Sequence, residues 1–376
     1  MASFDIQPLD RFAGKSAAIR RPKEITYFSY DDEHKFRLDA SSLRYYYPPR
    51  LGANLSAGFD TFKKLDDSTD DHLDSLLKSI MEMEKQEGNL CRADFITWRG
   101  MMTKIMTAPF DNFSKFEMNA TYFQGTIFIE ECHEAKAADQ ERQRRQKPRP
   151  GAPSQDMMSY WGYKFETLCL IPDIWDAVSR DYIENRENEI VNNHSQYCSV
   201  VKTGMGTASL VIGGEVDAVW DCKPADKDRP INWVELKTSE DPQSDTDLLK
   251  FERKLLKFWA QSFLLGVPKI IVGFRTKDGI LRRLEELETQ KLPGTVKRAG
   301  KGSWDGNLCI NFTASFLNFL KDTIKTDGIW RISRRERSRT VEVFKVEQSG
   351  HGRILTQEFV DWRQQQLARE VASMLG

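Results

Sequence analysis

Two short apolar segments carry charged residues in their middle, and this pattern constrains the fold more than any other feature of the chain. Glu215 and Asp217 lie in the first segment, Leu210–Trp220, and Glu235 and Lys237 lie in the second, eighteen residues further on. Residues two apart on a β-strand face the same side, about 6–7 Å from one another. If the two strands are neighbours, three carboxylates and one ammonium group therefore gather on one patch.

The electrostatic cost of such a patch indicates a metal site. Burying three like charges together is unfavourable unless positive charge compensates them. Lys237 supplies one positive charge, and Mg²⁺ or Mn²⁺, which prefer carboxylate oxygens, would supply the rest. The lysine is also suited to orient or deprotonate a water molecule, or to stabilise a pentacovalent phosphate. The segments therefore predict metal-dependent chemistry on phosphate groups.

An alternative is a β-hairpin with one solvated polar face and no site at all. The alternation of polar and apolar residues is not clean outside the charged positions, because Val211, Ile212, Val219 and Trp220 leave little room for a wet face. We favour the metal site for this reason.

The periodicity of apolar residues predicts a mixed α/β (α+β) architecture. Strands alternate with long helices in the second half of the chain, which is typical of a mixed sheet flanked by helices. A segment at about 135–155, rich in Arg, Gln and Pro, is predicted to be an exposed basic loop within one domain that spans residues 1–376, because the motifs fall on both sides of it. Helices are predicted over 71–84, 156–170, 246–265 and about 356–375, and strands over 119–131 with a break at Gly125, 196–221, 231–238 and 270–274.

The charge balance limits how the chain can hold a polyanion. Of its 376 residues, 55 are Lys or Arg and 56 are Asp or Glu, which leaves a net charge of −1. There is no global field to attract a nucleic acid, so any binding of this kind needs a local basic groove or metal ions.

Apolar runs and cysteines bear on the compartment. No apolar stretch approaches the ~20 residues of a membrane span, and the N-terminus lacks the pattern of a secretion signal, so no membrane partner is expected. The six cysteines form no C-x-x-C pair, which argues against a zinc finger and favours reduced thiols in the cytosol or nucleus.

Further candidates for the site lie outside the two segments. Each also has an ordinary interpretation: Arg99 as a surface ion pair, Glu166 as a surface glutamate, Cys198 as a buried strand cysteine and Gln261 as the polar edge of an apolar helix. The candidates for substrate or metal binding are Trp98, Arg99, Gly100, Glu166, Cys198 and Gln261.

The order Glu-x-Asp and then Glu-x-Lys resembles the core of the PD-(D/E)XK nuclease superfamily. Longer strings, in order along the chain, resemble more closely the eukaryotic RNA 5′-end decapping-nuclease family, which includes the fungal nuclear partner of the 5′–3′ exoribonuclease and the mammalian decapping exoribonuclease. The resemblance runs from about residue 20 to about residue 320. The strings are Trp98-Arg99-Gly100, Gly162-Tyr163-Lys164-Phe165-Glu166, Tyr197-Cys198-Ser199-Val200, Gly214-Glu215-Val216-Asp217, Val234-Glu235-Leu236-Lys237-Thr238-Ser239 and Leu255 to Phe263.

The resemblance implies a PD-(D/E)XK-like core with a second, smaller sheet, and it implies roles for individual residues. Glu215, Asp217, Glu235 and Lys237 would be catalytic. Divalent cations, two per site, would be bound by Glu166, Glu215, Asp217, Glu235 and the backbone carbonyl of Leu236. Substrate would contact Trp98, Arg99, Gly100, Cys198, Glu215, Lys237 and Gln261.

The family resemblance further implies hydrolysis of RNA 5′ ends. Triphosphate ends would give a monophosphate and pyrophosphate, incomplete or unmethylated caps would be released, and NAD caps are a further substrate of some members. The implied partners are RNA 5′ ends and a nuclear 5′–3′ exoribonuclease, and the implied compartment is the nucleus. Two alternatives stay open: a DNA endonuclease of the same superfamily, and a non-catalytic stabiliser of the exoribonuclease.

Overall fold

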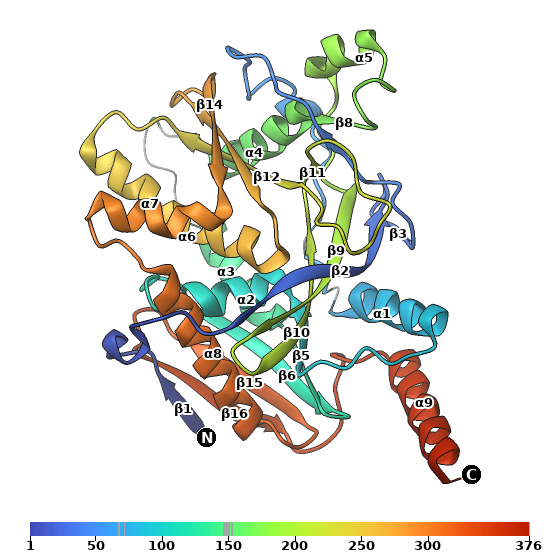
Figure 1. Cartoon of the computed structure of the whole chain (residues 1–376). Coiled ribbons are helices and arrows are strands. Elements are labelled where there is room, and N and C mark those ends of the chain that lie inside the picture. The colour runs from blue at the N-terminus through green and yellow to red at the C-terminus, as the bar shows by residue number, and fades with distance from the viewer. Residues whose placement is uncertain (67, 71, 146–150, 152, 376) are drawn as a thin grey trace.

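Two β-sheets, one above the other in Figure 1, form the frame of the molecule. The computed structural model describes residues 1–376 except 67, 71, 146–150, 152 and 376. Helices flank both sheets, which confirms the predicted mixed architecture with a second, smaller sheet.

The larger sheet is mixed and has ten strands within the described residues. β5 runs parallel to both of its neighbours, β7 and β10, and the other pairs are antiparallel. In spatial order the strands are β1 (Ala2–Asp5), β16 (Thr340–Glu347), β15 (Ile329–Arg334), β6 (Phe116–Phe123), β7 (Thr126–Glu131), β5 (Phe95–Trp98), β10 (Ala208–Glu215), β9 (Gln196–Met205), β2 (Ile19–Tyr30) and β3 (Phe36–Arg37).

The smaller sheet carries the second charged segment. Its described strands are, in spatial order, β14 (Leu281–Glu288), β13 (Lys269–Arg275), β12 (Trp233–Glu240), β11 (Ala218–Val219), β4 (Tyr45–Tyr46) and β8 (Leu170–Ile171). β12 and β13 are parallel, and the long helix α6 (Asp245–Leu265) makes the crossover between them. This is the strand–helix–strand unit that the sequence predicts.

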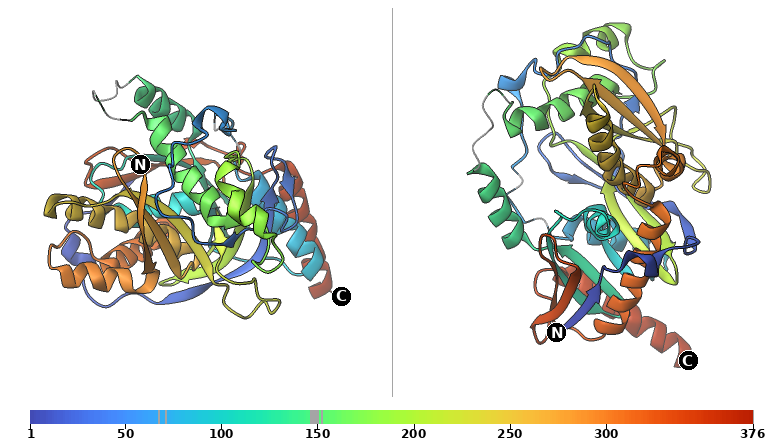
Figure 2. Two further views of the ribbon diagram at one scale, coloured as in Figure 1. Left: turned by 90° about the horizontal axis from the view of Figure 1, so that it is seen from above. Right: turned by 90° about the vertical axis from the view of Figure 1, so that its left-hand side faces the viewer.

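The other helices lie around the two sheets, and α1, α2, α4 and α8 pack on strands. They are α1 (Asp74–Glu87), α2 (Arg99–Thr107), α3 (His133–Arg144), α4 (Gln155–Cys169), α5 (Arg180–Asn185), α7 (Leu292–Ala299), α8 (Gly306–Thr323) and α9 (Gln357–Leu375), with single 3₁₀ turns at Leu9–Phe12, Phe59–Thr61, Arg186–Asn188 and Thr289–Lys291. α1 and α9 lie side by side, well away from α6 (Figure 2).

Three apolar clusters hold these layers together. One cluster packs α4 on the smaller sheet, with Phe165 against Val234 and Leu236. A second lies under α1 and α9. The third joins residues of α2, α6 and α8 to strands of both sheets, including Ile212 and Val272. α2 and α6 therefore lie where the two sheets meet.

The long predicted helices are confirmed, and local chemistry explains their ends. α6 begins where the Ser244 hydroxyl accepts a hydrogen bond from the Asp247 backbone N–H at 3.2 Å, and it ends at Gly266, whose φ of 73° suits glycine. α1, α4 and α9 match the predicted helices at 71–84, 156–170 and about 356–375 within a few residues.

The predicted basic loop at about 135–155 is wrong over its first part, because α3 extends to Arg144. The prediction considered only that this segment has little to bury. It neglected the Ala, Glu, Lys and Gln residues, which are strong helix formers. Ion pairs of Lys115 with Asp139 and of Glu141 with Arg145 support the helix. The remainder lies largely outside the described residues.

None of the described helices combines the length and the apolar character that a membrane span requires.

A buried ion pair ties the C-terminal helix to the body. Arg363 of α9 contacts Glu84 of α1 at 2.5 Å, and both residues are buried. We expect Arg363→Ala to cost about 3–5 kcal/mol in urea unfolding, because it leaves the Glu84 charge buried without its partner. Limited proteolysis should then cleave within residues 357–375.

The matched control is Arg92→Ala, which removes the exposed pair of Arg92 with Glu370 between the same parts of the chain. We expect it to cost less than about 1 kcal/mol. Equal losses in the two variants would contradict the role given to the buried pair.

Candidate active site

The two charged segments meet at the junction of the sheets rather than as neighbouring strands. β10 ends at Glu215 in the larger sheet, and the chain then crosses to the smaller sheet, where β11 pairs with β12 through Ala218 opposite Val234. Asp217 lies at the crossing. The prediction that the two segments pair as neighbours is therefore wrong for β10, whose neighbours are β5 and β9.

Two glycines allow α2 to approach this crossing. A Cβ atom at Gly213 would lie 2.9 Å from the ring of Trp98, and one at Gly214 would lie 2.9 Å from the Cβ of Arg99. Real Cβ atoms do not come so close, so only glycine lets the first residues of α2 sit against the end of β10. The Gly-Gly-Glu string thus places Arg99 beside the carboxylates.

Glu235 is the centre of the polar contacts. Its side chain is fully buried, its Oε2 accepts a hydrogen bond from Arg99 Nη1 at 2.9 Å, and its Oε1 accepts one from Lys237 Nζ at 2.5 Å. Next to it, Asp217 Oδ2 accepts a hydrogen bond from the backbone N–H of Leu236 at 2.6 Å. One carboxylate therefore holds both cations, and a second is fixed by the backbone of β12.

The other three carboxylates, Glu166, Glu215 and Asp217, lie among negative charges that the nearby cations do not compensate. Burial, with the charges of Asp217 and Glu215, raises the pKa of Glu166 well above its usual value. Burial and the charge of Glu235 raise the pKa of Asp217 to about 7, and burial also raises the pKa of Glu215. For Glu235 burial acts in the same direction, but Arg99 and Lys237 outweigh it and lower the pKa.

This donor set suits a hard divalent cation. Four carboxylates face two cationic side chains, so a negative excess remains that Mg²⁺ or Mn²⁺ would neutralise. Among the described residues, no three His, Cys, Asp or Glu side chains already stand in a metal-ligating arrangement. Glu235 is held instead by Arg99 and Lys237, and a cation would have to compete with them.

A cavity of about 300 Å³ opens beside Glu215. Trp98 and Cys198 line it, as does Lys136 of α3. Trp98 is held in place by a 2.8 Å hydrogen bond from its indole Nε1 to the His72 carbonyl, and Cys198 lies opposite Glu215 in the register of β9 and β10. Burial raises the pKa of the Cys198 thiol, so it lines the wall as a neutral group.

Sequence reasoning missed the aromatic wall of this cavity. Tyr30 and His34 line it and stack on each other with ring centroids 4.1 Å apart. Tyr30 is the last residue of β2 and His34 lies in the polar turn that follows, and no periodicity marks either residue. The one local signal is Asp31, a residue type that favours turns through bonds to its own backbone.

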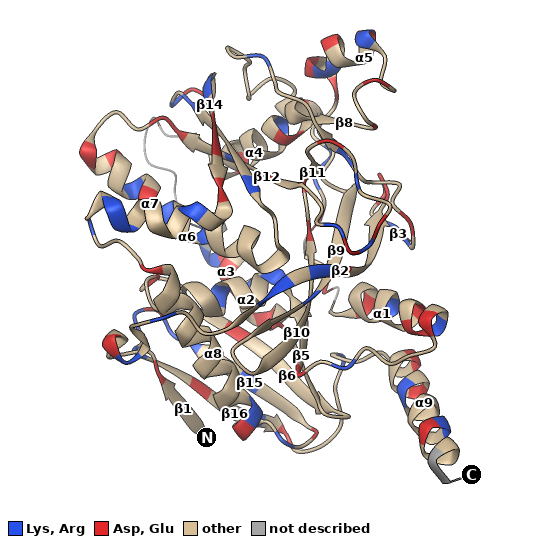
Figure 3. Cartoon of the chain, viewed as in Figure 1, with Lys and Arg blue, Asp and Glu red and all other residues tan. Residues whose placement is uncertain are grey.

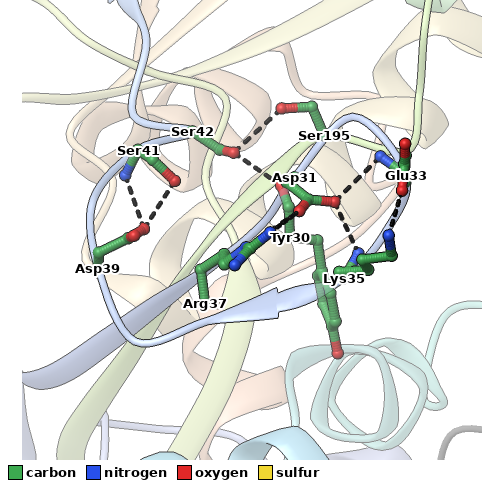
Figure 4. A network of polar contacts seen from close by, with 9 residues as sticks. All are labelled: Tyr30, Asp31, Glu33, Lys35, Arg37, Asp39, Ser41, Ser42 and Ser195. Carbon is green, nitrogen blue, oxygen red and sulfur yellow. Dashed lines mark hydrogen bonds and ion pairs between the residues drawn. The ribbon is translucent and has the colours of Figure 1, made fainter.

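Asp31 fixes the turn that carries His34. Its carboxylate accepts hydrogen bonds from the backbone N–H groups of Glu33 and Lys35, at 3.0 and 2.9 Å, and from Arg37 (Figure 4). The Lys35 backbone bond, with Arg37, lowers the pKa of Asp31 to about 2. Asp31 therefore stays ionised at ordinary pH, and the turn that it fixes keeps its shape.

The structure brings together most of the candidate residues, but not all of them equally. Gly100 lies in the first turn of α2, next to Arg99. Gln261 is half-buried on α6, and within the described chain no hydrogen bond joins its amide to the carboxylates.

Buried carboxylates around an E-x-K strand, at the junction of two mixed sheets, define a nuclease site of the PD-(D/E)XK type. A family model described as "RAI1 like PD-(D/E)XK nuclease" matches residues 20–360. The chain belongs to this family and is accordingly a hydrolase acting on RNA.

Known relatives cover almost the whole chain. It is 61% identical over 361 residues to the "Decapping nuclease RAI1" of Emericella nidulans, which covers 96% of this chain and 98% of the relative. Two solved structures are similar along their whole lengths. Candida albicans Rai1 in complex with pU5-Mn²⁺ has a TM-score of 0.89 and 31% identity, and Scheffersomyces stipitis Rai1 in complex with (3′-NADP)⁺ and calcium ion has 0.87 and 30%; each match covers 97% of this chain and 100% of the other.

The raised pKa of Asp217 predicts a pH-dependent response to metal. Between pH 3.8 and about 7 the folded, metal-free protein keeps a proton that the unfolded chain has released, so this group makes stability fall as the pH rises. A cation replaces that proton. We therefore expect Mn²⁺ to raise the melting temperature more at pH 8 than at pH 6, measured by thermal unfolding with EDTA as reference.

In the Asp217→Asn variant, the difference between the two pH values should largely disappear. An equal gain from Mn²⁺ at pH 6 and pH 8 in the original protein would contradict the assignment.

Proposed function

We propose that this RNA decapping nuclease hydrolyses RNA 5′ ends at the Glu235 cluster and leaves a 5′-monophosphate. One observation carries the proposal: a buried cluster with excess negative charge adjoins a cavity of about 300 Å³ that shares Glu215 with it. The cluster suits metal-assisted hydrolysis of a phosphate bond, and the cavity is large enough for one terminal group but not for a folded nucleic acid.

Each residue has a role in this proposal. Glu166, Glu215, Asp217, Glu235 and the Leu236 carbonyl would hold one or two Mg²⁺ or Mn²⁺ ions. Such ions stabilise the charge on the attacked phosphate and on the leaving oxygen.

Arg99 and the backbone N–H groups of Gly100 at the start of α2 would bind phosphate oxygens. Lys237 and Gln261 would hold the scissile phosphate and the attacking water. Trp98 and Cys198 would line the site of the 5′ group.

The reaction with a 5′-triphosphate end is a single displacement. The water oxygen forms a bond to the α-phosphorus, the bond from that phosphorus to the bridging oxygen of the β-phosphate breaks, and pyrophosphate leaves. The water gives up its proton to the Glu235 carboxylate, which also accepts a hydrogen bond from the Lys237 ammonium group.

With a capped end, water would attack the phosphorus of the first internucleotide linkage and the ribose 3′-oxygen would leave, which releases the cap with its first nucleotide. We include unmethylated or incomplete caps and NAD caps in the proposed substrates. The Scheffersomyces stipitis relative in complex with (3′-NADP)⁺ supports the last of these.

We also propose that the chain acts in the nucleus and binds and stimulates a 5′–3′ exoribonuclease, to which it passes the monophosphate product. The chemistry supports this order, since a released 5′-monophosphate is the end on which such an exoribonuclease acts.

A DNA endonuclease of the same superfamily is the weaker candidate, because the cavity beside Glu215 suits a chain end.

Removing two carboxylates should abolish catalysis. We expect the Glu215→Ala, Asp217→Ala double variant to lose pyrophosphate release from 5′-triphosphate RNA by about three orders of magnitude, because the metal ligands are gone. The control is Asp228→Ala, an exposed carboxylate paired with Lys23, which should keep full activity. Turnover of the double variant at the original rate with Mg²⁺ would show that the site is misassigned.

A panel of substrates separates the candidate functions. Triphosphate, capped, NAD-capped and monophosphate RNA, together with plasmid DNA, are incubated with Mg²⁺ or Mn²⁺, and product masses are measured. We expect 5′-monophosphate RNA from the first three and intact plasmid. Nicked plasmid with untouched RNA would favour the DNA endonuclease.

The partner role is tested by the same double variant. Because the carboxylates lie inside the cluster, we expect the variant to stimulate the exoribonuclease on monophosphate RNA as well as the original chain does. Loss of stimulation, with the fold intact by circular dichroism, would show that the two roles share one site.

A further inference from the structure

The strands β2 and β9 carry lysines that face each other. Lys23 of β2 and Lys202 of β9 lie directly opposite in the register of the larger sheet. Directly opposite residues point to the same face of a sheet, with Cβ atoms about 4.5–5.5 Å apart. Two like charges therefore stand side by side, an arrangement that destabilises a strand pair.

Arg20 adds a third cation to the same face. It lies opposite Gly204, which is two residues from Lys202 along β9 and so faces the same side. A Cβ atom at Gly204 would lie 2.8 Å from Nη2 of Arg20. The guanidinium group therefore lies over Gly204, in space that a larger residue at this position would fill.

These side chains line a cavity of about 480 Å³ at the end of α1. Arg21 and Lys227 also line it, and the facing wall consists of Met83 and Glu87 of α1 and residues 89–91. Lys202 is half-buried, and the other cations of the lining are exposed. Figure 3 shows basic residues on this part of β2. We call this the basic cavity.

The carboxylates near the basic cavity do not balance its positive charge. Three of them act on Lys23: Asp228 pairs with it, and Asp226 and Glu87 act at longer range. Glu24 lies on the other face of β2, where Lys223 contacts it at 2.6 Å. Within the described residues, four cations of the lining make no ion pair: Arg20, Arg21, Lys202 and Lys227.

The chemistry of this lining suits the phosphate groups of a single-stranded nucleic acid. Arginine binds phosphate oxygens through two parallel hydrogen bonds, and lysine adds a point charge. The chain belongs to a family of hydrolases that act on RNA, and its net charge of −1 provides no general attraction for a polyanion. A local groove with excess positive charge is what RNA binding then requires.

The basic cavity is separate from the carboxylate cluster. Cys198, beside Glu215, and Lys202 lie four residues apart on one face of β9, about 13 Å along the strand. Between them, Val200 belongs to the apolar cluster under α1. A strand of RNA that occupies both places must therefore pass around a helix about 10–12 Å wide. A trinucleotide is too short for this path.

We propose that the basic cavity binds the backbone of single-stranded RNA at a distance from the 5′ end. Binding at two places on one chain makes the second contact intramolecular, so long RNA is held more tightly than short RNA. The inference requires RNA as the ligand, but it does not depend on which 5′ end is hydrolysed.

The salt dependence of binding tests the inference directly. A fluorescent 30-nucleotide oligouridylate is bound to the Arg20→Gln, Lys202→Gln double variant in EDTA, and fluorescence anisotropy is followed over a range of salt concentrations. Each lost phosphate contact lowers the slope of log K against log salt by about 0.7, so we expect a slope lower by about 1.4. At fixed salt, binding should be roughly tenfold weaker.

The matched control removes the same charge elsewhere. Lys277 and Arg282 lie at the turn between β13 and β14, and neither makes an ion pair within the described part of the chain. Lys277→Gln, Arg282→Gln should keep the original slope and affinity. Because Lys202 faces Lys23, the test variant relieves a repulsion, and its melting temperature should not fall.

Kinetics separate this site from the catalytic cluster. With 5′-triphosphate RNA of 30 nucleotides, we expect the test variant to raise KM roughly tenfold and to keep kcat. With a 5′-triphosphate trinucleotide, both constants should stay unchanged. If the original protein releases no pyrophosphate, the proposed function fails, and the binding experiment still decides the inference.

Two results would overturn the inference. One is a test variant that binds the oligouridylate with the original slope and affinity. If that variant also loses the binding of a fluorescent polyglutamate, the basic cavity receives an acidic protein segment instead. The other is an equal loss on the trinucleotide, which would place the two residues at the catalytic cluster.

Discussion

Glu235 is buried in the interior between the sheets with one oxygen bound to Arg99 and the other to Lys237. A carboxylate at such depth is tolerable only because two cations compensate it. One of these cations begins α2 and the other lies two residues along β12, so the contact joins the helix that packs on the larger sheet to a strand of the smaller one. The site is assembled where this ion triad links the two halves of the frame.

The same triad explains why the pKa values of the surrounding carboxylates differ from that of Glu235. Both nearby cations are engaged by Glu235, so Glu166, Glu215 and Asp217 share a desolvated space with little positive charge left over. Their pKa values are raised because burial and the neighbouring carboxylates disfavour the charged forms, and a divalent cation bound there would favour those forms. In the proposed function, a protein of net charge −1 binds a polyanion through local charge at this cluster, where metal ions would compensate the carboxylates.

Glycine and aromatic residues shape the neighbourhood of this chemistry. Gly213 and Gly214 let Trp98 and Arg99 approach β10 more closely than any side chain would permit. Trp98, with the stacked rings of Tyr30 and His34, then walls the cavity beside Glu215. The carboxylate cluster and the cavity meet at one residue, Glu215, because it ends the strand on which both depend.

Local patterns in the sequence determined the long helices, the strand–helix–strand unit around α6 and the identity of the acidic residues, because periodicity, capping and the cost of buried charge act over short distances. Only the tertiary structure decided that β10 and β12 belong to different sheets, that Glu166 of α4 approaches Asp217 between β10 and β11, and that Tyr30 and His34 form a wall. Those contacts join residues far apart in the chain, and they depend on how apolar faces pack, which no local pattern encodes. The prediction missed helix α3 for a different reason. The helix propensity of its residues is a local signal, but the prediction considered only how little the segment could bury.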